Sequence, residues 1–266
     1  MKITQYYRIF IFGGTGNQLF QIREAIRNID KKVRLICLNQ RTADFWSLQL
    51  AEHTNLSVRK ASKIEVSIFH LCRLVFRSLG VLPAKNMSTL TRSVKIGGYH
   101  FGYFQYQDAV NLPLFLLIVN KIIAKTSNCP DTSSNIAVHI RKGDYLSKTN
   151  RKIYADISAE FILQMIAALG IPVREVDIYT DDTKWVEKHF LCSELKLNIM
   201  SEGKTALHDF ISLQQYQFLI LSNSTYAWWA GFLSPNVEKV VLPSKWYENQ
   251  FRLDLSLITN DGWTVI

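Results

Sequence analysis

The chain has 266 residues, enough for one large domain or two small ones with substantial cores. Hydrophobic residues make up 48% and charged residues 20%, a composition that excludes a disordered or fibrous protein. Lys and Arg outnumber Asp and Glu by 31 to 22 and give a formal charge of +9, so we expect an anionic partner: a nucleic acid, a membrane surface or a phosphorylated small molecule.

The first half of the chain begins as an α/β unit. Residues 7–12 have the pattern of a strand and end at a glycine-rich turn, after which residues 17–29 have the pattern of a helix. Further expected elements are a strand at 33–38, helices at 43–53 and 63–79, an extended stretch at 95–104 and a helix at 105–125. The polar segment 126–135, which contains a helix-stopping proline, sets the boundary between domains 1–130 and 131–266.

One expected helix, within residues 60–82, allows two interpretations. Its apolar stripe consists of Ile64, Ile68, Leu71, Val75 and Leu79, with Lys60, Lys63, Arg73 and Arg77 around it. Such a helix suits an anionic membrane surface. The ordinary amphipathic pattern favours the alternative, in which the stripe faces the core and the basic side is solvated.

The second half alternates between strands and helices. Strands are expected at 136–141, 176–180, 195–199, 218–222 and 239–242, and helices at 158–169, 183–190, 205–216 and from 225. This alternation predicts a parallel sheet with ligand sites at the carboxyl ends of its strands.

Cysteine spacing and apolar runs bear on where the protein works. The four cysteines form no CxxC or Cys/His cluster, which predicts neither a zinc site nor a disulfide framework and is typical of reduced cytoplasmic proteins. The N-terminal segment lacks the pattern of an export signal, and the longest purely apolar run, 114–119, is far shorter than the roughly 20 residues that span a bilayer. We therefore expect a cytoplasmic protein that does not cross a membrane.

The first candidate site is the turn 13–18 between the first strand and the first helix. Gly14 and Gly16 allow a ligand close to the backbone, a helix N-terminus favours negative charge, and Asn17 and Gln18 add side chains suited to a sugar or phosphate. Leu19 stands where a dinucleotide fingerprint needs Gly or Ala, so a nicotinamide cofactor is not favoured. A plain strand-to-helix turn is the alternative.

The second candidate site is the block 138–145. Side chains alternate along a strand, so His139 and Arg141 share one face and converge near its carboxyl end. An arginine there can hold a phosphate through two parallel hydrogen bonds, which Lys142 matches only as a point charge. The alternative is an internal pair between Arg141 and Asp144.

The third and fourth candidate sites follow later strands. Asp181 and Asp182 end one strand and suit a metal, catalysis or recognition of hydroxyl and amide donors, although one of them is expected to cap the following helix. Another apolar strand ends in four small polar residues before a helix, which predicts an anion cradle of hydroxyl and backbone N–H groups. These residues are Ser222, Asn223, Ser224 and Thr225; Trp228 and Trp229 beyond them are expected to pack in the core.

Six blocks, in this order, resemble glycosyltransferase family eleven, the α-1,2-fucosyltransferases that use GDP-fucose. They are GGTGNQLFQ at 13–21, GYFQ at 102–105, HIRKGDY at 139–145, DIYTDD at 177–182, SNSTYAWWAGFL at 222–233 and LPSKW at 242–246. The blocks cover most of the chain, and the HxRRxD-like block together with SNSxxxWW is the specific part. The second arginine of that block is Lys142 here.

The resemblance implies an α/β fold of GT-B type: two Rossmann-like domains facing a central cleft, the first on the acceptor side and the second binding the GDP-sugar. Arg141 and Lys142 would then meet the diphosphate, and His139, Asp181 and Asp182 would contribute to donor binding. Ser222, Asn223, Ser224 and Thr225 would line the pyrophosphate pocket, while Gly14, Gly16, Asn17 and Gln18 would face the cleft from the other domain.

The implied reaction is inverting transfer of L-fucose from GDP-β-L-fucose to a hydroxyl of a glycan, O2 of a galactoside, without a metal ion or other cofactor. Arg141 would stabilise the departing diphosphate, and Asp144 or a solvent relay would accept the acceptor's proton. The acceptor would be a galactose-containing glycan, with a lipid-linked one at the inner face of the membrane as an option. The alternatives are another GDP-sugar or another hydroxyl and, from a different class, a nucleic-acid-binding protein, against which the scattered basic residues argue.

Overall fold

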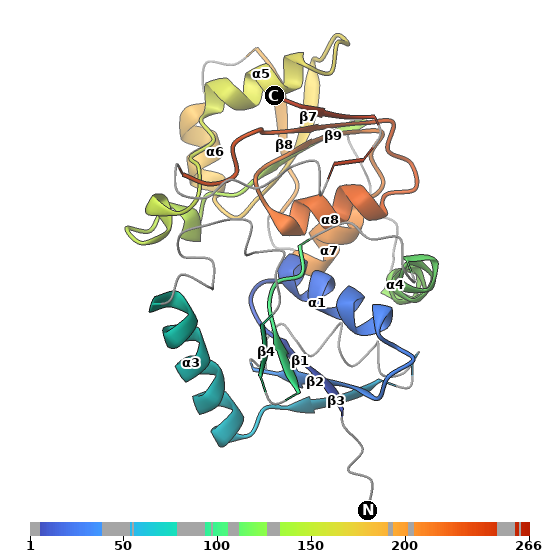
Figure 1. The fold of residues 1–266 in the computed structure, drawn as a ribbon. Helices are drawn as coiled ribbons and strands as arrows, with labels where there is room; N and C mark the ends of the chain where they lie inside the picture. Colours follow the sequence, from blue (N-terminus) through green and yellow to red (C-terminus); the bar gives the residue numbers. More distant parts are fainter. Residues whose placement is uncertain are drawn as a thin grey trace, which may run out of the picture. The chain divides into compact units, whose positions relative to one another are not determined.

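The computed structural model describes residues 6–38, 54, 56–78, 94–96, 98–105, 112–126, 134–190, 194–201, 205–248, 259–260 and 262–266. Within these residues, the chain divides after Lys125 into two compact units, here called unit 1 and unit 2 (Figure 1). The predicted domain boundary between 130 and 131 and the helix expected at 43–53 lie outside the described residues.

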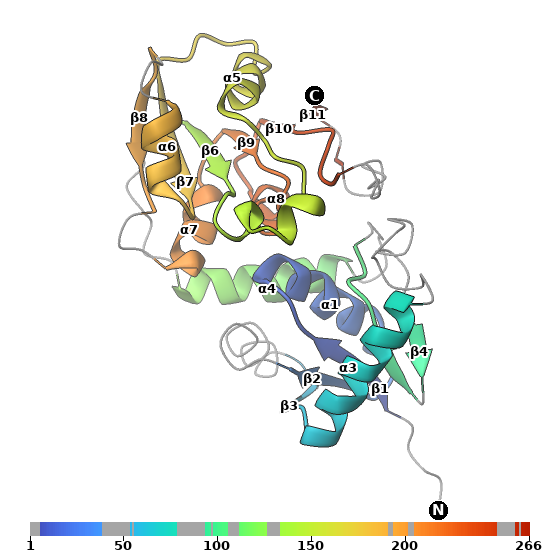
Figure 2. The ribbon, with the colours of Figure 1, turned by 90° about the vertical axis from the view of Figure 1, so that its left-hand side faces the viewer.

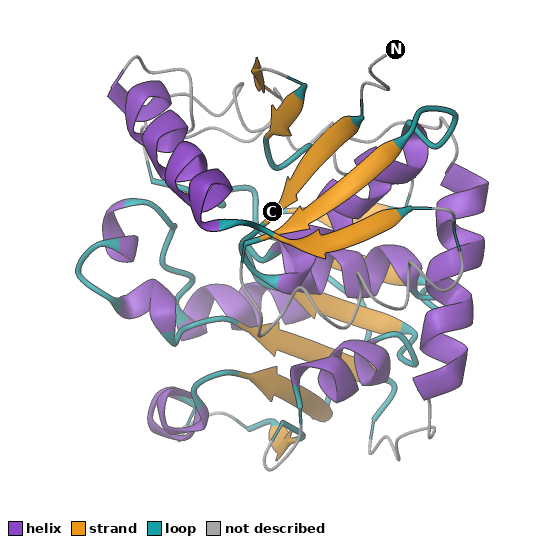
Figure 3. Ribbon diagram, turned by 90° about the horizontal axis from the view of Figure 1, so that it is seen from below, coloured by secondary structure: helices purple, strands orange, loops and turns teal. Residues whose placement is uncertain are grey.

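Unit 1 contains a five-stranded sheet in the order β3-β2-β1-β5-β4 (Figure 3). Neighbouring strands run parallel except β4, which pairs antiparallel with β5. The strands are β1 (Tyr7–Ile11), β2 (Val33–Cys37), β3 (Ser57–Lys60), β4 (Val94–Ile96) and β5 (Tyr99–Phe101), and the helices are α1 (Thr15–Arg27), α3 (Lys63–Ser78) and α4 (Leu112–Thr126).

The side of α3 that faces the sheet is not the one that the apolar stripe predicted. Phe69 packs against Phe10, Ile36 and Phe101, whereas the stripe residues point to solvent. Ile64 is 73%, Ile68 36% and Leu71 62% exposed. The favoured interpretation of a core-facing stripe is therefore wrong; the side chain of Val75 and all of Leu79 lie outside the described residues.

A buried carboxylate fixes which side of α3 faces inward. Both oxygens of Glu65 accept hydrogen bonds from the Arg59 guanidinium of β3, at 2.6 and 2.5 Å, and Oε1 also accepts from the Tyr99 hydroxyl of β5 at 2.9 Å. Arg59 is the main cause that lowers the pKa of Glu65 to about 2. Turning the apolar stripe inward would break this network and leave the charges of Arg59 and Glu65 apart.

Unit 2 contains a fully parallel sheet of six strands in the order β11-β10-β9-β6-β7-β8. The chain moves outward from β6 to β7 and β8, returns to β9 on the other side of β6, and continues to β10 and β11, which is the Rossmann strand order. The strands are β6 (Ile136–Ile140), β7 (Glu175–Thr180), β8 (Lys196–Ile199), β9 (Phe218–Leu221), β10 (Lys239–Leu242) and β11 (Trp263–Val265).

Helices flank the unit 2 sheet (Figure 2). The core between α5 and the sheet includes Val138, Ile162 and Ile220. The helical elements are η2 (Asp144–Leu146), η3 (Asn150–Lys152), α5 (Ala159–Ala167), α6 (Thr183–His189), α7 (Ala206–Leu213) and α8 (Thr225–Leu233). Within the described part of the chain, no helix is both long and apolar enough to span a bilayer.

The predicted α/β class with two Rossmann-like units is confirmed, because each unit has a mainly parallel sheet with helical connections. The central cleft stays a prediction.

Candidate active site

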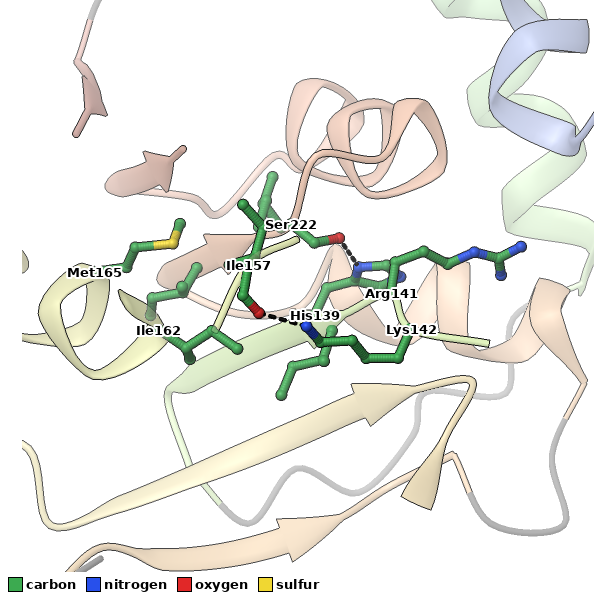
Figure 4. Close-up of a pocket in the computed structure, with 10 residues that line it drawn as sticks. His139, Arg141, Lys142, Ile157, Ile162, Met165 and Ser222 are labelled. Carbon is green, nitrogen blue, oxygen red and sulfur yellow. Dashed lines mark hydrogen bonds between the residues drawn. The ribbon is translucent and has the colours of Figure 1, made fainter. Parts of the chain in front are cut away.

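The candidate site lies where the chain of unit 2 reverses its direction across the sheet, between β6 and β9. Parallel sheets bind ligands at the carboxyl ends of the two strands that flank such a switch point. His139, near the end of β6, and Ser222, directly after β9, meet here: Nδ1 of the imidazole lies 2.8 Å from the Ser222 hydroxyl (Figure 4). Both side chains are buried.

Burial also sets the charge of the imidazole. The pKa of His139 is lowered to about 4, mainly because burial disfavours the charged ring. The positive charge of Arg141 lowers it further, and the carboxylate of Asp181 opposes both effects. This lowered pKa makes His139 neutral at pH 7, so the ring can offer a ligand hydrogen bonds but no positive charge.

Arg141 emerges from the end of β6 and is held by two carboxylates. Its Nη2 atom lies 2.7 Å from Oδ1 of Asp144, and Nη1 lies 3.0 Å from Oδ2 of Asp181. The pair between Arg141 and Asp144 that the sequence offered as an alternative is thus present. The arginine side chain is still 37% exposed, which leaves part of the guanidinium accessible to a ligand.

Asp181 organises the turn that follows β6. Its Oδ1 atom accepts a hydrogen bond from the backbone N–H of Lys142 at 2.8 Å, while Oδ2 pairs with Arg141. The turn passes so close that a Cβ atom on Gly143 would lie 2.6 Å from Oδ2 of Asp181. A larger residue at position 143 would therefore have to displace the Asp181 carboxylate.

The side chain of Lys142, which was predicted to meet the diphosphate, points into the fold of unit 2 in this structure. This side chain is 2% exposed, and Nζ donates to Oδ1 of Asp156 and to the carbonyl of Ile157, both at 2.5 Å. The ammonium also lies 4.1 Å from the centroid of the Trp185 ring. Alternation along the chain directs Lys142 opposite to Arg141, and Figure 4 shows its amine turned toward Ile157.

Asp182 has the capping role that the sequence allowed for one of the two aspartates. It is the N-cap of α6 and accepts a hydrogen bond from the backbone N–H of Trp185 at 3.0 Å. Asp181 is therefore the member of the pair that faces Arg141, and a donor contact from Asp182 stays a prediction.

The loop after β9 is tied down from within. Asn223 donates from Nδ2 to the carbonyls of Ala155 and Trp246, both at 2.9 Å, and its own carbonyl accepts from the Tyr145 hydroxyl at 3.0 Å. Oδ1 of Asn223 is buried without a hydrogen-bond partner among the described residues. This fixed loop holds Ser222 beside His139.

The same loop leads into α8. Ser224 is its N-cap, but makes no side-chain capping hydrogen bond, unlike the N-cap residues of α5, α6 and α7. Trp228 and Trp229 are fully buried, which confirms the prediction that they pack in the core. A helix N-terminus favours an anion nearby. Ser224 is buried, and the cradle of Ser224 and Thr225 stays a prediction.

A small cavity of about 10 Å³ lies beneath the switch point (Figure 4). It is lined by His139, Lys142, Ile157, Met165 and Ser222, among others. This volume is about the least that holds one water molecule, so it cannot take a sugar or a nucleotide. A ligand of that size would have to lie outside this cavity.

The glycine turn of unit 1 forms its own network. Gly13, the first residue of the candidate turn, has a φ angle of +82°, a backbone conformation that favours glycine. Gln18 is buried and donates to the Gly13 carbonyl at 2.8 Å, and the Asn17 side chain accepts from Gln105 at 2.8 Å. Gln18 thus closes the turn, whereas Gly14 is exposed and a Cβ there would meet nothing within 4 Å.

Sequence reasoning missed three further residues. Gln21 accepts from the N–H of Phe12 at 3.0 Å and donates to the carbonyl of Gly102 at 3.2 Å, joining the ends of β1 and β5. Gly143 and Tyr145 belong to the block that contains Arg141, and a glycine between charged residues was the available signal. Gly16 is buried at the start of α1. That Gly16 faces a cleft between the two units stays a prediction.

The residues described contain no group of three or more His, Cys, Asp or Glu side chains that could hold a metal ion. The predicted independence of a metal is a matter for experiment.

Comparison with known proteins places the chain in a class and a family. The sequence model of Glycosyl transferase family 11 matches residues 50–266. The chain is therefore a glycosyltransferase, and it belongs to family 11.

Two curated relatives from Escherichia coli match most of the chain. The O-antigen biosynthesis glycosyltransferase WbnK is 26% identical and the alignment covers 94% of this chain and 97% of WbnK. An alpha-1,2-colitosyltransferase is 21% identical, with 90% of this chain and 91% of the relative covered. A crystal structure of POFUT1 in complex with GDP-fucose matches at 11% identity and a TM-score of 0.39, covering 91% of this chain and 98% of that one.

Proposed function

We propose that this glycosyltransferase moves L-fucose from GDP-β-L-fucose to O2 of a galactoside, with inversion at the anomeric carbon and without a metal ion. The observation that carries the proposal is Arg141, a partly exposed guanidinium at the switch point of the GDP-sugar-binding unit, next to neutral His139 and the start of α8. Membership of a glycosyltransferase family also favours this reaction over nucleic-acid binding.

Binding of the diphosphate requires an exchange of partners at Arg141. Asp181 is only 26% exposed and also bonds the backbone of Lys142, whereas Asp144 is 57% exposed and its carboxylate pairs with Arg141 alone among the described residues. Asp144 is therefore the carboxylate that the diphosphate replaces. Asp181 keeps its contact and holds the guanidinium in the orientation that two parallel hydrogen bonds to phosphate require.

The exchange supplies both parts of the reaction. The bond between the anomeric carbon and the β-phosphate oxygen breaks, GDP leaves with the electron pair, and Arg141 and the N-terminus of α8 stabilise its charge. The acceptor oxygen attacks the opposite face of the sugar and loses its proton. Asp144, released from Arg141, is our candidate for the group that takes this proton, directly or through water.

We place the acceptor among surface glycans built in the cytoplasm, galactose-ended and lipid-linked at the inner face of the membrane. The support is the function for which one relative is named, O-antigen biosynthesis. The other relative is named for colitose, so a second candidate donor is GDP-colitose, which lacks the 3-hydroxyl of GDP-fucose.

The decisive test is a donor and acceptor screen with Arg141 variants. GDP release would be measured with GDP-fucose, GDP-colitose and GDP-mannose, with galactosides as acceptors, and the linkage of each product determined by NMR. Arg141→Lys should lower kcat/KM by at least about 100-fold, because a point charge replaces the two parallel hydrogen bonds. Turnover should persist in EDTA.

Arg174 offers a matched control, since its side chain is exposed and lies before β7. Arg174→Ala should keep wild-type kcat/KM and Tm. Near wild-type turnover of Arg141→Lys with an unchanged Tm would refute the proposed role of Arg141. Transfer from another donor only, or to another hydroxyl, would correct the substrate while leaving that role intact.

Asp144→Asn tests the exchange of partners separately. Removing the competing charge should lower the Kd for GDP, while losing the proton acceptor should lower kcat. A weaker affinity for GDP would contradict the exchange.

A further inference from the structure

The exposed apolar residues of this protein concentrate on α3. Ile64, Ile68, Leu71 and Leu74 are 73%, 36%, 62% and 64% exposed, and they are four of the eight large hydrophobic side chains that are exposed among the described residues. Spacings of four, three and three residues put them on one side of the helix, here called the α3 outer face. The remaining four are spread over other elements: Leu117, Leu163, Ile171 and Val265.

This orientation of α3 is firmly fixed. Phe69 packs in the core on the opposite side, and Glu65 is held by Arg59, Tyr99 and the N–H of Ser62. The outer face therefore cannot turn inward without breaking a buried ion pair. Exposure of these apolar side chains to water destabilises the free protein, and a partner that covered them would remove this destabilisation.

The charges around the α3 outer face are positive. Lys60, the last residue of β3, and Lys63, the first residue of α3, are exposed, and the sequence adds Arg73 and Arg77 further along. The acidic residue between 60 and 78 is Glu65, which is buried and paired with Arg59. An apolar stripe with basic residues beside it is the composition of helices that lie in the surface of anionic bilayers.

We propose that the α3 outer face docks on an anionic phospholipid bilayer, with its four apolar side chains at the level of the acyl boundary and Lys60 and Lys63 at the headgroups. Charge favours this occupant over a second copy of the chain. Two α3 helices packed face to face would bring like charges together, whereas anionic lipids complement them. The α3 outer face shares no residue with the candidate active site, so the inference goes beyond the proposed function.

Vesicle flotation of the purified protein tests this proposal. Wild-type protein should float with vesicles of phosphatidylglycerol and phosphatidylcholine, bind weakly to phosphatidylcholine alone, and dissociate at high salt. Leu71→Ser/Leu74→Ser should lower the partition coefficient at least about tenfold, because two apolar side chains leave the bilayer. Each of Lys60→Gln and Lys63→Gln should lower it by roughly fivefold.

The matched control is Leu117→Ser/Leu163→Ser, which removes two leucines that are 53% and 36% exposed and lie outside α3. This variant should bind vesicles like wild type. Four results would overturn the proposal: no flotation of wild type with anionic vesicles, equal flotation of the α3 variant, equal loss in the control, or a change in oligomeric state of the α3 variant in gel filtration. Far-UV circular dichroism and Tm would verify that each variant is folded.

Discussion

The close approach of Gly143 to Asp181 makes a sharp prediction about the turn that carries Arg141. In Gly143→Ala, the new Cβ atom would lie 2.6 Å from Oδ2 and 3.1 Å from Cγ of Asp181. Carbon and oxygen atoms do not approach so closely without repulsion, so the carboxylate must move. Oδ2 then no longer pairs with Arg141, and Oδ1 no longer accepts from the Lys142 backbone.

The size of the effect follows from these two broken interactions. A hydrogen bond from a backbone N–H to a carboxylate contributes about 1.5 kcal/mol at the lower end of its range. The ion pair with Arg141 adds less than about 1 kcal/mol, since both side chains are partly exposed. Gly143→Ala should therefore lower the free energy of unfolding by about 1.5–2.5 kcal/mol, and Asp181→Ala should do the same.

Urea unfolding of the two single variants and the double variant separates this cause from others. Once Asp181 is an alanine, the clash is gone, so Gly143→Ala/Asp181→Ala should be no less stable than Asp181→Ala, within about 0.5 kcal/mol. The kcat/KM values should follow the same pattern, because each change leaves Arg141 without its fixed partner. Additive losses in the double variant would refute the reasoning.

Three further predictions concern buried charged and titratable groups. Glu65→Gln should lower the free energy of unfolding by about 2–3 kcal/mol at pH 7. Because folding lowers the pKa of Glu65 to about 2, its contribution is present above its usual pKa near 4.5 and is lost as pH falls toward 2, so the gap between variant and wild type should close over that window. Folding lowers the pKa of His139 to about 4, so the unfolded chain binds a proton at a higher pH than the folded one. The free energy of unfolding should therefore decrease as the pH falls from 6.5 to 4, and urea titrations should show a smaller decrease for His139→Asn. Lys142→Met should lower the free energy of unfolding by about 1–2 kcal/mol, because the Ile157 carbonyl loses the hydrogen bond from Lys142. The KM for the sugar donor should stay within about threefold of wild type, and a large rise in that KM would support a role of Lys142 in donor binding.

Much of unit 2 could be predicted because its signals are local. The strands β6, β9 and β10 are short apolar runs between polar turns, which is the pattern of strands buried on both faces. The rule that ligands bind at the carboxyl ends of parallel strands then relates His139 to Ser222. These residues are 83 positions apart in the sequence, and the structure brings them into hydrogen-bond contact.

The orientations of α3 and of Lys142 were not predicted, since each depends on which polar partners the fold brings to a buried charged group. Along its length α3 carries both an apolar stripe and a side with Phe69. The latter faces inward, with Phe69 in the core and Glu65 bonded to Arg59 and Tyr99. Lys142 presents the same difficulty. Its neighbour Arg141 made a shared role plausible, but a buried ammonium needs partners, and those come from Asp156 and Ile157, fourteen and fifteen residues away.

The positive charge of the whole chain therefore does not measure the charge at the candidate site. Of the two neighbouring cations, Lys142 is paired inside the fold with Asp156, and Arg141 faces the two carboxylates Asp144 and Asp181, so the surface cluster sums to −1. In the proposed exchange, a diphosphate would meet this net negative cluster until it displaced Asp144, so the formal +9 of the chain would not by itself favour its binding. Under that proposal, recognition depends on the orientation of the Arg141 guanidinium and of the α8 N-terminus. The surplus of basic residues includes Lys60 and Lys63 beside the α3 outer face.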